Sequence, residues 1–245
     1  VARSLSDVTG LSLADIHVIY NPLIPDNLDI LRAVPCSHHW FASNEIPVVV
    51  SAGRLEKQKD FSTLIHAAAI VNKNQQVRFL LLGEGSERTH LEALVSRLGI
   101  QAVVDMPGYV DNVYSYMDHS SVFVLSSAWE GFPSVLVEAM ACGIPVVSTD
   151  CPSGPDEILK GGRYGRLVPV GNPNALAEAI GEALSQPGDT ELARIRAGEF
   201  SVGRAVKDWA PMERSHVQNS PRTSSRWLNT RRTSAGSLVL AILSR

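Results

Sequence analysis

Two glutamates stand eight residues apart in the segment 130–138, which reads EGFPSVLVE. Glu130 falls in a polar loop, whereas Glu138 falls inside a helix expected over 133–142, with its side chain leaning back toward the start of that helix. Carboxylates accept hydrogen bonds, so sugar hydroxyls are natural partners, and the unpaired N–H groups of a first helical turn suit a diphosphate. The segment predicts a site for a phosphorylated, hydroxyl-bearing ligand; two solvated glutamates are the alternative.

Two cations accompany this segment. Arg54 and Lys59 follow a strand expected over 46–52 and precede a helix expected over 60–72. Arginine offers a fork of donors and lysine a compact charge, so the two could share a diphosphate. Solvated loop cations are the alternative for either residue alone. Taken together with the glutamate segment, the pattern favours a site.

The elements that must position these residues alternate between strand and helix, as a doubly wound parallel sheet requires. Strands are expected over 46–52, 77–82, 102–106, 121–126 and 144–148, with a short extended run over 165–170. Helices are expected over 60–72, 86–98, 112–118, 133–142, 154–159 and 173–185. Pro133 suits the first helical position and Gly143 a helix end. Ligands bind beyond the carboxyl ends of such strands, where both glutamates and both cations are expected.

Several blocks, in this order, resemble retaining, nucleotide-sugar-dependent glycosyltransferases of family 4, which have the GT-B fold. Residues 130–147 resemble the E-x7-E signature, 51–61 the phosphate-binding G-R-x(3,4)-K element, and 82–88 the G-x-G loop. Residues 108–110 resemble the turn that faces the base, and 149–158 and 164–171 complete the series, so the resemblance covers about residues 10–187. It implies an α/β, Rossmann-like doubly wound parallel sheet that forms the C-terminal half of a GT-B fold.

The resemblance also implies an activity and roles. A sugar would move from a nucleoside diphosphate sugar, with UDP-sugar as the expected donor, to a glycan or lipid-linked acceptor with retention. Glu130, Arg54 and Lys59 would be catalytic, because negative charge grows on the leaving diphosphate, and Glu138 would bind the ribose. No metal and no cofactor besides the donor are expected. The implied donor-binding residues are Gly53, Arg54, Lys59, Gly83, Glu84, Gly85, Tyr109, Val110, Glu130, Gly131, Phe132, Pro133, Ser134, Val135, Leu136 and Glu138.

Spacing suggests two rival kinds of site. Residues 83–88 follow an expected strand and open a helix, as a nicotinamide-dinucleotide fingerprint would, but the sixth position is Arg88, where helix packing needs a small residue. Cys36, His38 and His39 could suggest a metal site, but no second pair of ligands accompanies them. Both rivals are therefore disfavoured.

Composition narrows the classes of protein. The chain has 22 basic and 25 acidic residues, so it has no excess of positive charge that would indicate binding to nucleic acid. Three cysteines at irregular spacing argue against a disulfide framework and favour a reducing cytosol. The apolar run 238–243 is too short to span a bilayer, so we expect a cytoplasmic protein, with peripheral contact at the inner face of the membrane left open.

We expect three regions along the chain. Residues 1–44 resemble a remnant of the amino-terminal domain and the interdomain crossover, 45–187 the nucleotide-sugar-binding domain, and 188–245 a terminal helix remnant over 200–209 with a basic tail. Segment 217–235 lacks apolar periodicity and is expected to be disordered. From residue 203 onward there are eight basic and two acidic residues. This excess of positive charge allows two interpretations: the tail contacts an anionic membrane or a phosphate, or it is a segment that never folds.

Three hypotheses follow. The chain is the donor-binding half of a retaining glycosyltransferase that lacks its amino-terminal domain, or a binding module that works with a separate partner chain, or a decayed fragment that binds no ligand. The base of the nucleotide could be uracil, guanine or adenine.

Overall fold

The computed structural model describes residues 2–13, 16–43, 45–207, 231–232 and 238–242. The chain forms two compact units. One joins Val1–Asp26 to Gly198–Arg245, and the other is Asn27–Ala197.

The unit Asn27–Ala197 is built on a six-stranded parallel sheet with the strand order β4-β3-β2-β5-β6-β7. Counted along the chain this is the order 3-2-1-4-5-6 of doubly wound nucleotide-binding folds, so the predicted Rossmann-like α/β class is confirmed. The order reverses between β2 and β5, which makes that junction the place where such folds bind ligands. The strands are β2 (Val48–Ala52), β3 (Arg78–Leu82), β4 (Val104–Gly108), β5 (Val122–Leu125), β6 (Val146–Thr149) and β7 (Arg166–Val168).

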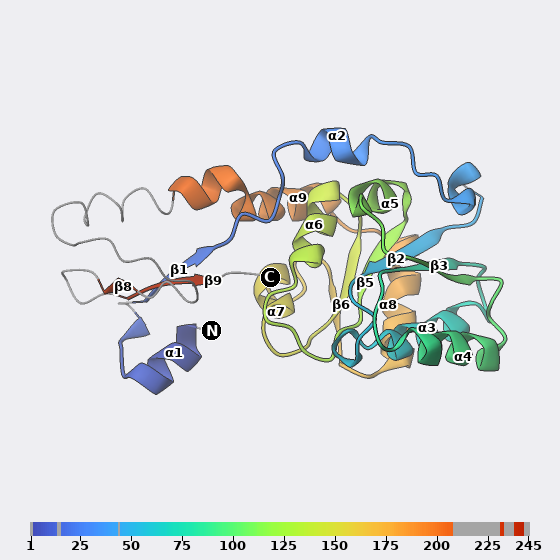
Figure 1. Cartoon of the computed structure of the whole chain (residues 1–245), viewed down its shortest axis with the longest axis horizontal. Coiled ribbons are helices and arrows are strands. Elements are labelled where there is room, and N and C mark those ends of the chain that lie inside the picture. Colours follow the sequence, from blue (N-terminus) through green and yellow to red (C-terminus); the bar gives the residue numbers. More distant parts are fainter. Residues whose placement is uncertain (1, 14–15, 44, 208–230, 233–237, 243–245) are drawn as a thin grey trace. The chain divides into compact units, whose positions relative to one another are not determined.

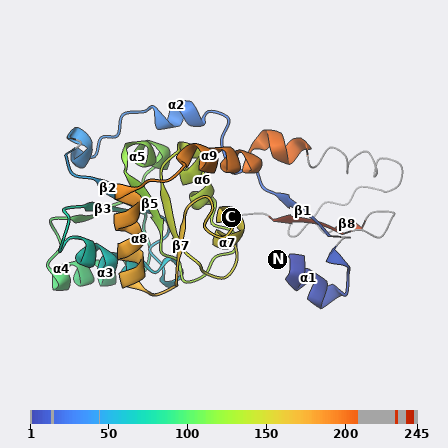
Figure 2. The same cartoon turned by 180° about the vertical axis from the view of Figure 1, so that it is seen from behind.

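Helices connect the strands and cover both faces of the sheet (Figures 1 and 2). One face carries α3 (Phe61–Val71), α4 (Arg88–Leu98) and α8 (Pro173–Ser185). The other carries α5 (Val113–His119), α6 (Ser134–Cys142) and α9 (Thr190–Ala197), while α7 (Pro155–Leu159) packs beside β7. All five residues of β2 are buried, because central parallel strands are covered on both sides.

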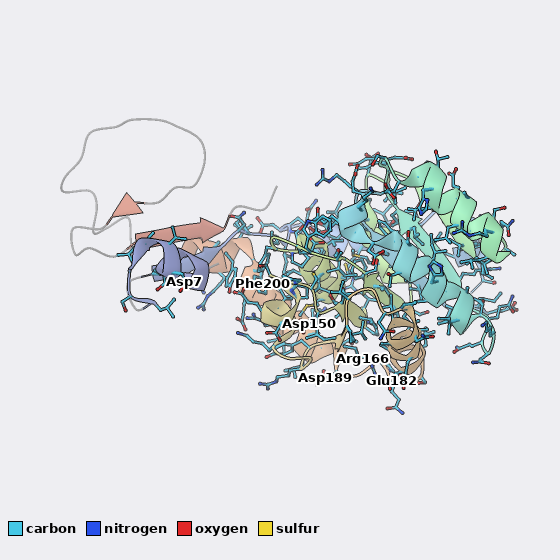
Figure 3. All side chains as sticks on the ribbon, turned by 90° about the horizontal axis from the view of Figure 1, so that it is seen from below. Asp7, Asp150, Arg166, Glu182, Asp189 and Phe200 are labelled. Atoms are coloured by element: carbon cyan, nitrogen blue, oxygen red, sulfur yellow. The ribbon has the colours of Figure 1, made fainter. Side chains whose placement is uncertain are left out.

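Two further connections hold the edges of this unit. Before β2 come α2 (Leu28–Arg32) and the 3-10 turn η2 (His39–Ala42), and Arg32 Nε lies 2.7 Å from Asp118 Oδ1 at the end of α5. At the other edge, Arg166 Nε on β7 lies 3.3 Å from Glu182 Oε2 on α8, and the two residues are labelled next to each other in Figure 3. Residues 27–43, which fall in the region expected as a remnant of the amino-terminal domain and interdomain crossover, belong to the same compact unit as the sheet.

Some element ends differ from the sequence prediction for identifiable reasons. The strand expected over 102–106 is shifted to Val104–Gly108 and includes Pro107. Proline is tolerated there because β4 is an edge strand, where a missing N–H breaks no central ladder. Helix α6 begins at Ser134, with Pro133 as the residue before the first turn, so the predicted helix start is wrong by one residue. Gly143 ends the helix in a left-handed conformation, as predicted.

Helix α9 was not predicted, and the expected boundary at 187 differs from the compact unit, which continues to Ala197. Its buried face packs against α6 and includes Arg196, which is only 4% exposed. Arg196 Nε donates to the carbonyl of Ile158 at 3.2 Å, and Nη2 donates to that of Glu157 at 3.0 Å. One buried guanidinium thus donates to two successive carbonyls of the short helix α7.

Changing Arg196 to methionine is expected to lower the free energy of unfolding by about 2–4 kcal/mol, because buried carbonyls lose charged donors. Arg194→Met is the matched control on the same helix, since Arg194 is 48% exposed and pairs only with Glu191 in the described part of the chain. Its effect should stay within about 0.5 kcal/mol. Urea denaturation of both variants measures the difference, and equal losses would contradict the role of Arg196.

The other unit holds a small sheet of order β1-β9-β8. It contains α1 (Ala2–Thr9), β1 (Ile16–Tyr20), β8 (Arg231–Arg232) and β9 (Leu238–Ile242), and β9 runs parallel to β1. The expectation of a tail that never folds is therefore wrong for β8 and β9. The short apolar run of β9 could not form a sheet by itself, but β1 provides a partner strand. Residues 202–207 are helical, in agreement with the helix expected at 200–209. Segment 217–230 lies outside the described residues.

Candidate functional site

The loops that follow β2 and β5 meet at the switch point of the sheet. Lys59 ends the 3-10 turn η3 (Lys57–Lys59) after β2, and Glu130 lies in the loop after β5. Lys59 Nζ lies 2.6 Å from Glu130 Oε1, with side chains only 16% and 5% exposed. The structure therefore joins two of the three predicted catalytic residues in a largely buried ion pair.

The carboxylate of Glu130 is held on both oxygens. Ser127 Oγ donates to Oε1 at 2.6 Å, and Gln58 Nε2 donates to Oε2 at 3.2 Å. Thr149, at the end of β6, donates to the carbonyl of Ser127 at 2.6 Å and so supports the loop from the next strand. A charge buried this deeply persists only when it is paired and hydrogen-bonded. The alternative of a solvated glutamate is thus wrong for Glu130, and its side chain is fixed before any ligand arrives.

Arg54, the third predicted catalytic residue, is not part of this pair. It lies just beyond β2 with an exposed side chain, and among the residues that the structure describes its guanidinium has no hydrogen-bond or ion-pair partner. It is therefore available to an anion from solvent. The Lys59 stem occupies the space beside the predicted Gly53, because a Cβ built on that glycine would lie 3.1 Å from Lys59 Cε.

The start of α6 lies beside the Glu130 loop. Leu136 N–H donates to the carbonyl of Pro133 at 3.1 Å, while the N–H groups of Ser134 and Val135 have no partner in the described part of the chain. Free N–H groups in a first turn can bind a phosphate. Gly154 closes this corner, since a Cβ there would lie 2.4 Å from Pro133 Cδ, and its φ of +107° favours glycine.

The remaining predicted residues of this segment differ in what they can offer. The Leu136 side chain is fully buried, so it faces the core and leaves only its backbone for a ligand. Gly131 is exposed, and Phe132 and Val135 are half-buried. Exposed Trp129, 52% accessible, lies next to Glu130 and was missed, because a lone tryptophan in a polar loop has no periodic signal.

Glu138 lies four residues into α6 from Ser134, in a half-buried position. Burial raises the pKa of Glu138, and a hydrogen bond with the Ser134 side chain partly opposes that rise. Ser134 lies one turn earlier in α6, so this interaction agrees with a side chain that leans toward the start of the helix, which stays a prediction. Nearby Tyr114 has its pKa raised to about 12 by burial and by the charge of Glu138.

The variant Glu138→Gln should be more stable than the wild type at pH 7 and equally stable below about pH 4, the ordinary range of glutamate in an unfolded chain. A folded-state pKa raised above the unfolded value gives stability that is present at low pH and is lost as pH rises through the folded pKa. Glutamine stays neutral and escapes this loss. Urea denaturation from pH 4 to 7 tests this, with exposed Glu178→Gln on α8 as control. Parallel wild-type and Glu138→Gln profiles would refute it.

The glycines predicted to enclose the base have a packing role in the structure. Gly83 N–H donates to the carbonyl of Gly108 at 2.8 Å, and Leu55 N–H donates to that of Glu84 at 2.8 Å. A Cβ on Gly83 would lie 2.0 Å from the carbonyl oxygen of Gly53, and one on Gly85 would lie 2.3 Å from that of Leu55. The loops beyond β2, β3 and β4 therefore interlock through bare backbone. Contact of Gly83 and Gly85 with a donor stays a prediction.

Arg88, the last residue of the segment that resembles the G-x-G loop, fixes the same corner. Its Nε and Nη2 each lie 2.7 Å from a carboxylate oxygen of Glu84, and Nη1 donates to the carbonyl of Met106 at 3.1 Å. The hydrogen bond to Glu84 is the largest cause of its raised pKa. Glu84 is thereby held beside Gly108, since a Cβ on that glycine would lie 2.9 Å from Glu84 Oε1. Tyr109, the next residue, is 75% exposed.

The Cys36 region has a structural explanation. His38 Nε2 lies 2.9 Å from Asp105 Oδ2, and its Nδ1 accepts from Trp40 N–H at 3.3 Å, so both ring nitrogens are occupied within the fold. In the described ranges no three His, Cys, Asp or Glu side chains are grouped so that they could hold a metal ion. None of the helices in those ranges is both long and apolar enough to cross a bilayer.

Residues 39–199 match the family model described as "Glycosyl transferases group 1". A Campylobacter jejuni N-acetylgalactosamine-N,N'-diacetylbacillosaminyl-diphospho-undecaprenol 4-alpha-N-acetylgalactosaminyltransferase is 36% identical over 167 residues, covering 65% of this chain and 44% of that protein. The lipopolysaccharide core biosynthesis glycosyltransferase LpsE of Rhizobium meliloti is 36% identical over 164 residues, covering 67% and 47%. The chain thus spans less than half the length of these relatives.

Solved structures show the same architecture. Sucrose-phosphate synthase from Thermosynechococcus elongatus matches with a TM-score of 0.63 and 26% identity, over 80% of this chain and 49% of that one. HepE from Anabaena, solved in complex with UDP and glucose, matches with a TM-score of 0.60 and 25% identity, over 78% and 52%. These proteins have the GT-B fold, and the region matched by this chain is about half of each.

Proposed function

The chain belongs to the group 1 glycosyltransferases, and on that premise we propose that the unit Asn27–Ala197 binds the nucleoside diphosphate part of an activated sugar at the Lys59–Glu130 pair. The observation that carries the proposal is the position of this buried pair, 2.6 Å apart at the switch point of the sheet and beside the free N–H groups of α6. A buried, oriented pair of charges at that place is well suited to a ligand that carries charge and hydroxyls.

The proposed division of labour follows from charge. Lys59, Arg54 and the N–H groups of Ser134 and Val135 bind the diphosphate, and they stabilise the negative charge that grows on it as the glycosidic bond breaks. Because Lys59 and the helix N–H groups are held in place by the fold, they need little reorganisation during the reaction. Glu130 accepts hydrogen bonds from hydroxyls of the donor sugar, and the chemistry proposed requires no metal ion.

On the other side of the diphosphate, Glu138 binds the ribose hydroxyls. Its raised pKa has a consequence for binding, because the carboxylate form accepts two hydroxyl hydrogen bonds and the protonated form loses part of that capacity. The loops at Gly83 and Tyr109 enclose the base in this proposal. Their mutual hydrogen bonds and the Arg88 clamp support it, since they hold both loops at the same edge of the sheet.

Relatives suggest the substrates. We take UDP-sugar as the donor, because HepE has been solved with UDP and glucose. A glycan or lipid-linked acceptor is supported by the Campylobacter and Rhizobium proteins, whose names refer to a diphospho-undecaprenol-linked sugar and to the lipopolysaccharide core. Transfer with retention, and work at the cytoplasmic face of a membrane through peripheral contact, complete the proposal.

Sugar transfer would need a second, acceptor-binding domain. This part of the proposal rests on the relatives, because the matched region is less than half of each. An amino-terminal domain on a longer chain or a separate partner chain could provide it. Nucleotide binding by Asn27–Ala197 does not depend on which of the two is correct, because all the residues assigned to the diphosphate lie within this unit.

Isothermal titration calorimetry with UDP, GDP and ADP tests the proposal. We expect binding of UDP that is weakened at least about tenfold by Glu138→Ala, since a carboxylate that bonds two hydroxyls contributes on the order of 1.5–3 kcal/mol. Glu178→Ala, at an exposed glutamate of α8, should leave binding unchanged. Heat signals from none of the three nucleotides would refute the proposal and favour a fragment without a ligand.

A further inference from the structure

Gln58, the residue before Lys59, spans the two loops of the site. Its side-chain Nε2 donates to the carbonyl of Trp129 at 3.0 Å and to Glu130 Oε2 at 3.2 Å. Its backbone carbonyl accepts from Ala128 N–H at 2.8 Å. Gln58, in the loop after β2, therefore contacts three successive residues of the loop after β5, across the switch point of the sheet.

The two oxygens of Glu130 are held by different chemistry. Oε1 receives Lys59 Nζ and Ser127 Oγ, both at 2.6 Å, while Oε2 receives the neutral amide of Gln58. If Lys59 serves a diphosphate, the ligand competes with Glu130 for the same positive charge. A neutral amide has no comparable attraction to the diphosphate, so its hydrogen bond to Glu130 can persist when the ligand binds.

We propose that Gln58 is a positioning residue that keeps Glu130 directed at the donor sugar when Lys59 engages the diphosphate. This inference rests on the proposed function and extends it. It separates two tasks within the sequence Gln58-Lys59: the lysine binds the charge of the nucleotide, and the glutamine preserves recognition of the sugar.

The proposal has a specific consequence for affinity. UDP alone has no sugar for Glu130 to contact and meets Glu130 only as a competitor for Lys59, so the loss of Gln58 should change its dissociation constant much less than that of a UDP-sugar. A UDP-sugar adds contacts with Glu130, so the ratio of the dissociation constants, UDP over UDP-sugar, should depend on Gln58.

Two variants test this in the full 245-residue chain. Gln58→Met has a similar length but no donor, and Gln58→Glu keeps the shape while placing a second carboxylate near Oε2. Calorimetry with UDP and with the UDP-sugar that the wild type binds best, chosen among UDP-glucose, UDP-galactose and their N-acetylamino forms, gives the ratio for each. We expect it to fall about tenfold in Gln58→Met, as for a hydrogen bond to a charged group, and further in Gln58→Glu.

Gln101→Met is the matched control, because Gln101 is exposed and its amide meets only Ser96 Oγ, at 3.4 Å, in the described chain. It should leave both constants unchanged. A ratio unchanged in both Gln58 variants, or equal losses for UDP and UDP-sugar, would overturn the role of Gln58 while leaving nucleotide binding intact. A wild type that binds neither ligand would remove the proposed function itself, and this inference with it.

Discussion

We expect Lys59→Met to weaken the binding of UDP by about tenfold to 100-fold and to change the binding of uridine little. Methionine keeps most of the aliphatic stem that packs on Gly53 but removes the ammonium group. A hydrogen bond to a charged group contributes about 1.5–3 kcal/mol, which sets the size of the loss. Calorimetry with the nucleoside diphosphate and with the bare nucleoside measures it.

The design must separate lost binding from lost stability. Removing Lys59 leaves Glu130 buried without its cation, which destabilises a fold by about 3–5 kcal/mol. The double variant Lys59→Met with Glu130→Gln removes that uncompensated charge and should fold well while still binding UDP weakly. Lys57→Met, two residues away and exposed, is the control and should bind as the wild type does. Equal losses for UDP and uridine would remove the phosphate role of Lys59.

Gly83→Ala is expected to lower the free energy of unfolding by more than about 4 kcal/mol, or to prevent folding. Its φ of +139° is strained for alanine, and a Cβ would lie 2.0 Å from the carbonyl oxygen of Gly53. The neighbouring backbone cannot yield without breaking the hydrogen bonds that join Gly83 to Gly108 and Leu55 to Glu84. Chemical denaturation followed by far-UV circular dichroism measures the loss.

The same substitution elsewhere should have the opposite sign. Gly181 lies inside α8, where a Cβ would meet nothing within 4 Å. Gly181→Ala should therefore stabilise the protein by about 0.5–1 kcal/mol through helix propensity. Comparable stabilities of the two variants would show that the interlocked loops beyond β2 and β3 are not held as described.

Periodicity made much of the doubly wound fold predictable. The apolar run of β5 indicated a buried strand, Gly99 and Gly143 ended α4 and α6 as expected, and the alternation of elements fixed the class. Helix α9 was missed, because its buried face includes Arg196, which a pattern of apolar residues counts as exposed. Edge strand β4 was displaced, because its Pro107 is acceptable only at a sheet edge, which local sequence does not identify.

The candidate site was predictable where it coincides with family motifs. Lys59 and Glu130 were both named, but their ion pair joins residues 71 apart, and only the strand order places them together. Gln58, Ser127 and Thr149 received no role in the predicted site, because single polar residues have no period and their partners lie in other loops. The packing role of Gly83 and Gly85 was also beyond reach, since it depends on a backbone approach between separate loops.

A crystal structure of the chain with UDP tests the central claim most directly. The account predicts the diphosphate within hydrogen-bond distance of the Ser134 and Val135 N–H groups and of Lys59 Nζ, with the ribose hydroxyls on Glu138. UDP bound away from the junction of β2 and β5, or a Glu138 carboxylate turned into bulk solvent beside a bound nucleotide, would contradict it.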